Sequence, residues 1–210
     1  MSSPESGERS AGENVPRRPS QVTRMLAWAG LDAPRLEAAR VVLGARSLRA
    51  SGSMVSAPQD GSAPFSASYA LSTNEVGAVG RLTVRTVCDQ GEQHVTLTRS
   101  EEGIWLVDHG KGAARTDFDG ALDVDLAFSP LFNTLPVRRL ALHHVDSEHE
   151  LHIVFVTLPS LDVQLVQQTY RSVSVGEPAV VGLRADSFDV DITIDPDGMV
   201  LEYPGLAKRA

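Results

Sequence analysis

Residues 65–72 read FSASYALS, with apolar side chains at alternate positions and small or polar ones between them. Side chains of a β-strand point alternately to the two faces of a sheet, so this period of two predicts a strand with one buried face. The same alternation occurs in residues 81–86 (RLTVRT), 122–128 (LDVDLAF) and 188–194 (FDVDITI). The sequence therefore predicts an all-β protein.

Turn-forming residues separate these stretches. Clusters of this kind occur at 59–61 (QDG), 89–91 (DQG), 109–112 (HGKG) and 195–198 (DPDG). Short strands separated by such turns favour one long antiparallel meander. Residues 151–158 (LHIVFVTL) are apolar on both faces, which predicts a central strand covered from both sides.

Residues 32–48 allow two interpretations. Asp32 and Pro34 resemble the cap and first turn of a helix, and residues 35–40 favour helix formation. The pair Val41 and Val42, however, is β-branched and suits a strand better. From the residues alone, helix and strand both stay open here.

Composition limits the function. The 210 residues carry 19 basic and 27 acidic side chains, a formal net charge of −8, which argues against a nucleic-acid partner. The single cysteine, Cys88, excludes an internal disulfide and a cysteine-based zinc site. No apolar run approaches the ~20 residues of a membrane-spanning helix, and no secretory signal is recognisable. We therefore expect a cytoplasmic protein without stable membrane insertion, whose oligomeric state stays open.

Residues 1–20 (MSSPESGERSAGENVPRRPS) are rich in Ser, Gly, Pro and charge. Such a segment buries too little apolar surface to offset the entropy lost on ordering. We expect a disordered tail over residues 1–20, followed by a single domain over residues 21–210.

Motifs of catalysis and cofactor binding are missing from the sequence. It contains no nucleophile elbow, no phosphate-binding P-loop and no HExxH zinc motif. Residues 109–112 fit a hairpin loop better than a phosphate cradle, and residues 195–198 fit a β-turn better than a calcium loop. His143 and His144 should point to opposite faces of a strand, whereas metal ligands must converge. We therefore predict no catalytic residue, no metal site and no cofactor.

Residues 120–140 read GALDVDLAFSPLFNTLPVRRL. They resemble the hallmark of a bacterial family described as "putative glycolipid-binding" in the DVDL motif at 123–126, the NTLP core at 133–136 and the RRL ending at 138–140. Residues 200–206 (VLEYPGL) are similar to the closing pattern of that family. The resemblance extends over about residues 23–210.

This resemblance implies a spiral β-roll, in which one long antiparallel sheet curls into an incomplete barrel, and it favours strands over residues 32–48. It also implies a lipid or glycolipid as partner and supplies no catalytic residues. The chain departs from the hallmark at Ala121, where the family has a cysteine, which excludes a functional thiol there. The structural hallmark residues are Asp123, Asp125, Pro136, Arg139, Pro204 and Gly205.

The hallmark also allows a prediction of strand register. If residues 122–127 and 137–142 are antiparallel neighbours, Asp125 lies opposite Arg139, and Arg138 points to the apolar side. A buried arginine needs an anion or several carbonyl acceptors. Arg138 is therefore either an anchor for the carbonyls of the 133–136 loop or a contact to the polar head of a ligand. The ligand-binding candidates are Arg138, Asn133, Thr134 and Tyr203.

Three classes of function stay open. A non-enzymatic lipid or glycolipid binder, which we favour, needs an apolar cavity of roughly 300 Å³ or more inside the rolled sheet. A structural or protein-interaction domain needs only a packed core. An enzyme would use a histidine with carboxylates, and the candidates are Asp123, Asp125, Asp189 and Asp191. Carboxylates that alternate along a strand usually form its hydrated face, which weighs against the enzyme.

Overall fold

The computed structural model describes residues 21–58, 61, 63–186 and 188–210, so the expectation of a tail over residues 1–20 lies outside the described part. Its elements are β1 (Val22–Gly30), β2 (Arg35–Leu43), β3 (Leu48–Ser56), β4 (Phe65–Thr73), β5 (Val79–Cys88), β6 (Gly91–Arg99), β7 (Trp105–Asp108), β8 (Ala113–Thr116), η1 (Phe118–Gly120), β9 (Asp123–Leu126), α1 (Pro130–Arg139), β10 (Glu148–Val156), β11 (Val163–Ser174), β12 (Ala179–Ala185), β13 (Phe188–Ile194), β14 (Val200–Tyr203) and β15 (Ala207–Arg209).

All of these strands belong to one sheet, which consists of two meanders. β1 pairs with β15, so strands β1–β8 extend from this junction in one direction and strands β15–β9 extend in the other. The edge strands are therefore β8 and β9, which follow one another in the chain. Among the described strand pairs, only β9 with β10 is parallel.

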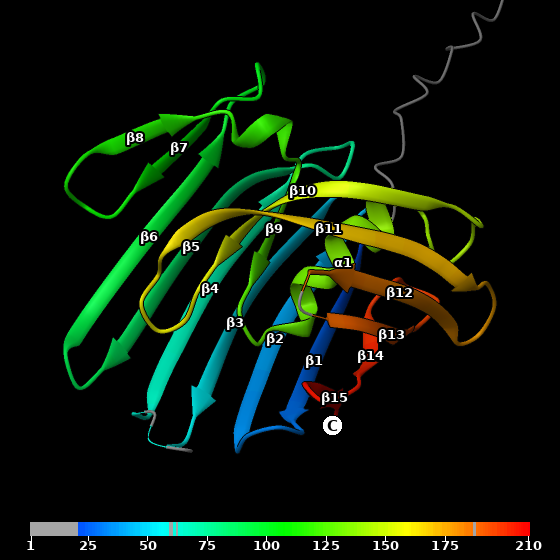
Figure 1. The fold of residues 1–210 in the computed structure, drawn as a ribbon, viewed down its shortest axis with the longest axis horizontal. Coiled ribbons are helices and arrows are strands. Elements are labelled where there is room, and N and C mark those ends of the chain that lie inside the picture. Colours follow the sequence, from blue (N-terminus) through cyan, green and yellow to red (C-terminus); the bar gives the residue numbers. More distant parts are fainter. Residues whose placement is uncertain (1–20, 59–60, 62, 187) are drawn as a thin grey trace, which may run out of the picture.

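The link between the two edge strands requires the sheet to curl. From Thr116, at the end of β8, to Asp123, at the start of β9, the chain can reach at most about 25 Å. A flat sheet of this many strands would separate its edges by about 65 Å. The sheet therefore bends back on itself, and β10–β15 (yellow to red) lie across the blue-to-green strands in Figure 1. It is not closed into a barrel, and the predicted all-β roll is confirmed.

Helix α1 fills the space between the two halves of the sheet (Figure 1). Leu131, Phe132 and Leu135 belong to a buried cluster formed mainly with the N-terminal meander. Val137, further along the helix, belongs to a second cluster built mainly from β12 and β13. The centre of the roll is therefore packed. Within the described part of the chain, no helix is long and apolar enough to cross a bilayer.

The helix contradicts the predicted register of the hallmark. Residues 137–142 form no strand, and β9 pairs with β10 instead, so Asp125 does not lie opposite Arg139. The helix begins with Ser129 and Pro130, a recognisable signal because proline is favoured in the first turn. Pro136 inside the helix weakens its intrinsic propensity, and burial of the helix between two clusters provides the compensating stability.

The predictions for residues 32–48, 109–112 and 195–198 agree with the structure. Residues 32–48 contribute to β2 and β3, as the resemblance favours, and the 109–112 loop joins β7 to β8. The 195–198 turn brings β14 back onto β13, with Thr193 opposite Glu202. The pairing of β15 with β1 was not predicted.

Candidate functional site

Strand β9 separates two environments inside the roll. Val124 and Leu126 point into the first apolar cluster, whereas Asp123 and Asp125 point away from it, toward α1 and β11. The prediction that these carboxylates form a hydrated face is wrong. Asp123 is 1% exposed and Asp125 is partly buried, because α1 and the C-terminal meander cover this face of the strand.

Asp123 and Arg139 form an ion pair that joins β9 to the end of α1. Arg139 Nη2 lies 2.5 Å from Asp123 Oδ2, and Arg139 Nε donates to both carboxylate oxygens at 3.1 and 3.2 Å. Burial raises the pKa of Asp123, and the guanidinium counteracts part of that rise. The pair therefore joins the strand that precedes the helix to the last turn of the helix.

A second polar group lies at the start of α1. Ser129 and Tyr69 both donate hydroxyl hydrogens to Glu37 Oε1, at 2.6 and 2.5 Å. Glu37 is 2% exposed, and burial raises its pKa to about 7, against the lowering effects of Ser129, Tyr69 and Arg35. Its second oxygen, Oε2, has no hydrogen-bond partner. This arrangement orients the Ser129 hydroxyl, whose hydrogen is directed at Glu37.

A cavity of about 610 Å³ opens at one end of the roll. One of its walls contains Arg35, whose guanidinium lies 4.6 Å from the centre of the Phe128 ring and 2.7 Å from Asp32 Oδ1. The lining comes from the β1–β2, β3–β4, β5–β6, β9–α1 and β10–β11 connections and the strand ends beside them. It consists of Asp32, Ala33, Arg35, Ser56, Ala57, Ala63, Phe65, Cys88, Asp89, Gln90, Gln93, Phe128, Leu158, Pro159 and Ser160.

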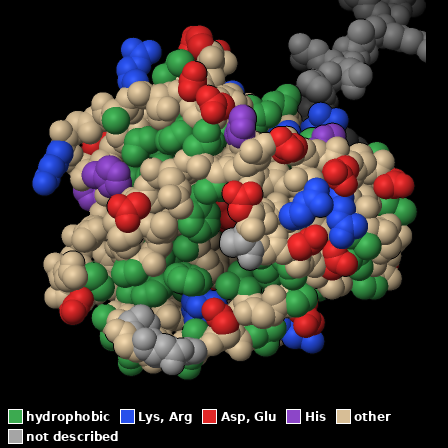
Figure 2. Space-filling view, viewed as in Figure 1, with side chains coloured by type: hydrophobic (Ala, Val, Ile, Leu, Met, Phe, Trp, Pro, Cys, Tyr) green, Lys and Arg blue, Asp and Glu red, His purple; other side chains and the backbone are tan. Residues whose placement is uncertain are grey.

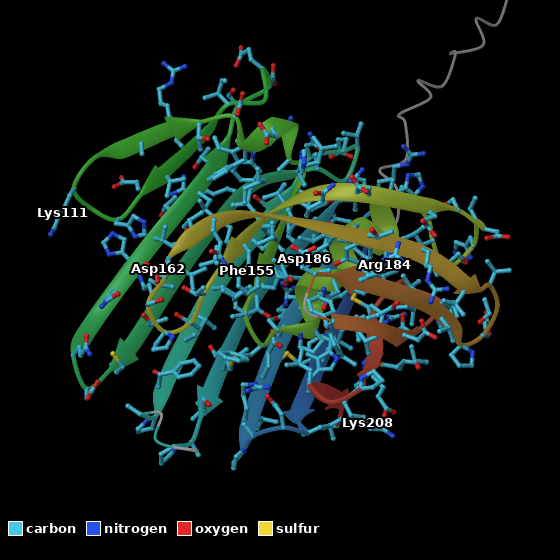
Figure 3. All side chains as sticks on the ribbon, viewed as in Figure 1. Lys111, Phe155, Asp162, Arg184, Asp186 and Lys208 are labelled. Atoms are coloured by element: carbon cyan, nitrogen blue, oxygen red, sulfur yellow. The ribbon has the colours of Figure 1, made fainter. Side chains whose placement is uncertain are left out.

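A second cavity, of about 230 Å³, lies beside β9 and shares Phe128 with the first. Its lining residues are Asp125, Leu126, Ala127, Phe128, Ser129, Asn133, Phe155, Gln168, Phe188, Tyr203 and Leu206. Phe155, labelled in Figure 3, lies opposite Asp125 in the β9–β10 register. Figure 2, which views the molecule from the same side as Figure 3, shows apolar side chains along the hollowed middle of this side.

The polar groups of the small cavity are only partly satisfied. Burial raises the pKa of Asp125 to about 7, and Gln168 Nε2 approaches Asp125 Oδ2 at 3.5 Å. Gln168 is 4% exposed, and its Oε1 has no hydrogen-bond partner. Asn133 Nδ2 donates to Tyr170 Oη at 3.1 Å, and burial raises the pKa of Tyr203.

The structure brings together only some of the predicted site residues. Asn133 and Tyr203 line the small cavity. Thr134 is fully buried and does not line this cavity, and its Oγ1 has no hydrogen-bond partner. Pro136 lies within α1, whereas Pro204 and Gly205 lie between β14 and β15.

Arg138 lines neither of these two cavities but a third one, of about 530 Å³, together with residues of the β2–β3 and β13–β14 turns. It donates to the carbonyl oxygen of Asp197, and its Nη2 donates to that of Gly44 at 3.0 Å. It therefore joins the β2–β3 and β13–β14 turns, rather than binding the carbonyls of the 133–136 segment as one prediction had it.

Sequence reasoning missed Arg35, Glu37 and Gln168. A signal exists for the first two, because they fall in phase with Ala39 on the buried face of β2, where an apolar residue is expected. Charged residues on a buried face need partners, and in this protein they find them at the cavities. Gln168 lies on β11, two residues before the buried Tyr170 and therefore on the same face of the strand.

The histidine cluster is not arranged as predicted. His143 and His144 lie in the turn after α1, with their rings 3.9 Å apart, and not on opposite faces of a strand. Over residues 21–58, 61, 63–186 and 188–210, no three His, Cys, Asp or Glu side chains are grouped so that they could hold a metal ion.

The fold defines the class of protein as an all-β chain built on one curled sheet, with cavities beside its internal helix. The chain belongs to the family described as "Putative glycolipid-binding", whose sequence model matches residues 25–209. A similar solved structure is the crystal structure of a DUF1089 family protein from Pseudomonas aeruginosa. It is 20% identical, with a TM-score of 0.66 over 99% of this chain and 100% of that chain, and this likeness shows the fold. A comparison with curated proteins gave no match.

Proposed function

We propose that this protein is a non-enzymatic lipid-binding protein whose ligand is a glycolipid held at the open end of the roll. The observation that carries this proposal is the 610 Å³ cavity, whose volume falls within the roughly 300–1,000 Å³ of small-molecule sites. Its apolar walls include Phe65, Phe128 and Leu158. Transfer of an acyl chain from water to such walls is favourable by roughly 25 cal/mol per Å² of buried apolar surface.

The position of the cavity matters for how a ligand would enter. Helix α1 occupies the middle of the roll. The acyl chain of the ligand would therefore lie at the open end of the roll and not along the axis of the roll. Polar side chains at this end, among them Gln90 and Gln93, would stay in contact with water or with the polar part of the ligand. Membership of the family supports a lipid class of ligand.

The test is a cavity-filling substitution with a matched control. Ala57 lines the cavity, whereas Ala70 is exposed on β4 and lies outside it. Calorimetric titration with octyl glucoside, below its micellar concentration, should show binding to the wild-type chain and to Ala70→Trp. Ala57→Trp should lose most of the affinity, because the indole occupies the volume of the acyl chain. Equal affinity of both variants for octyl glucoside would contradict the proposal.

A further inference from the structure

The two cavities are neighbours that share a wall residue. Phe128 lines both cavities, and Arg35 reaches from the larger one toward the carbonyl oxygen of Leu206, which lines the smaller one. The smaller cavity has room for about eight waters at ~30 Å³ each, which is enough for one six-membered ring. A ligand with its chain in the larger cavity would therefore place its head group in the smaller one.

The polar groups of the smaller cavity offer oxygen acceptors. The Ser129 hydroxyl hydrogen is directed at Glu37, and one amide hydrogen of Asn133 is directed at Tyr170. Gln168 Oε1 is buried without a hydrogen-bond donor, and a buried acceptor without a partner costs free energy. Because this oxygen is out of reach of solvent, the amide has to rotate toward the cavity to accept a hydrogen bond from a ligand. Asp125 adds a carboxyl group, whose carbonyl oxygen accepts hydrogen bonds in either protonation state. The cavity therefore favours a head group that donates several hydrogen bonds.

The remaining walls are aromatic. Phe155, Phe188 and Tyr203 line the cavity, and Phe188 is 37% exposed. Such rings offer apolar faces for the axial C–H groups of a sugar ring, while the acceptors bind hydroxyl groups at its edge. An ammonium head group would also donate hydrogen bonds. An ammonium group would bind to the carboxyl group of Asp125. The uncharged oxygen acceptors of the cavity would then stay without a donor.

We propose that the 230 Å³ cavity is a hexose-binding subsite, in which Asp125 and Gln168 accept hydrogen bonds from sugar hydroxyls and Phe188 packs on the ring. This assignment rests on the proposed function, since it takes the acyl chain to lie in the larger cavity.

The test compares two amphiphiles that carry the same chain. Octyl glucoside has a head group rich in hydroxyl donors, whereas octyl tetraoxyethylene has ether acceptors and one hydroxyl. Phe188→Ala removes an exposed ring, and Gln168→Met removes the unsatisfied oxygen at similar volume. Each should lower the affinity for octyl glucoside about ten-fold and leave that for octyl tetraoxyethylene within two-fold. Val76→Ala, at an exposed residue outside both cavity linings, should change neither affinity.

Each result either supports or overturns the subsite. Equal losses for the two amphiphiles, or no loss for octyl glucoside, would overturn it, as would tighter binding of octylammonium than of octyl glucoside. Binding of both amphiphiles that is blocked by Ala57→Trp, but insensitive to Phe188→Ala, would leave the proposed function standing without the subsite. Binding of neither amphiphile to the wild-type chain would instead reject the proposed function.

Discussion

Tyr69 on β4 donates its hydroxyl hydrogen to Glu37 on β2 at 2.5 Å, although β3 lies between these strands. Gly52 on β3 is paired directly with Tyr69, and a Cβ atom at residue 52 would collide with the Tyr69 hydroxyl and ring. The missing side chain lets the tyrosine lie across the middle strand. This contact holds the carboxyl group that in turn orients Ser129 beside the small cavity.

Gly52→Ala should displace the Tyr69 ring and lower the free energy of unfolding by about 1–3 kcal/mol, the usual range for overpacking. Chemical denaturation measures this change. Ser53→Ala, at the exposed neighbouring position, is the control and should stay within about 0.5 kcal/mol of wild type. A stable Gly52→Ala protein would show that the tyrosine has another low-energy position.

Glu37→Gln should alter the dependence of stability on pH. The folded-state pKa of Glu37 is raised to about 7 from 4.5, so the folded chain binds the extra proton and loses stability as the pH rises through this interval. The loss of unfolding free energy caused by Glu37 should become constant above pH 7, at no more than about 3 kcal/mol. Glutamine does not titrate, so the variant should gain stability relative to wild type between pH 4.5 and 8. Denaturation curves across that range test this, and a constant difference would argue against the raised pKa.

Replacing only one partner of the Asp123–Arg139 ion pair should strongly lower the free energy of unfolding. Asp123→Asn or Arg139→Met leaves a buried partner without its counter-charge, with an expected loss of about 3–5 kcal/mol. The exposed pair Arg85–Glu92 is the control, and removal of either charge should cost less than about 1 kcal/mol. Equal effects at the two pairs would mean that solvent reaches Asp123.

Arg138→Leu should destabilise the fold without altering ligand binding. Its guanidinium joins the turns at Gly44 and Asp197, and hydrogen bonds from charged groups contribute about 1.5–3 kcal/mol each. The melting temperature should therefore fall, while the affinity for octyl glucoside at a temperature where the variant stays folded should be unchanged. If a folded variant loses affinity for octyl glucoside, Arg138 contacts the ligand and this prediction is wrong.

Strand alternation predicted much of the fold because each strand exposes one face and buries the other. Residues 65–72 and 188–194 became β4 and β13, as their period of two indicates. At residues 122–128 the same period correctly predicted a strand, β9, but the expected hydrated face is wrong, because Asp123 is buried. A period of two reports the orientation of side chains, and it does not report what covers them.

The candidate site was harder to predict because it depends on contacts between distant segments. Asn133 and Tyr203 were identified through the family pattern, whereas Arg35 and Glu37 became recognisable only once β2 was known to bury one face. Arg138 was misplaced because the segment around Pro136 was taken as a loop and strand, when its burial between two apolar clusters stabilises a helix. Local propensity could not supply that tertiary contribution.

Native mass spectrometry of the gently purified full chain, followed by solvent extraction, tests lipid binding most directly. We expect one bound lipid per chain that loses a hexose on fragmentation, present in Ala70→Trp and depleted in Ala57→Trp. A chain that emerges free of lipid and stays free when incubated with octyl glucoside would contradict the account.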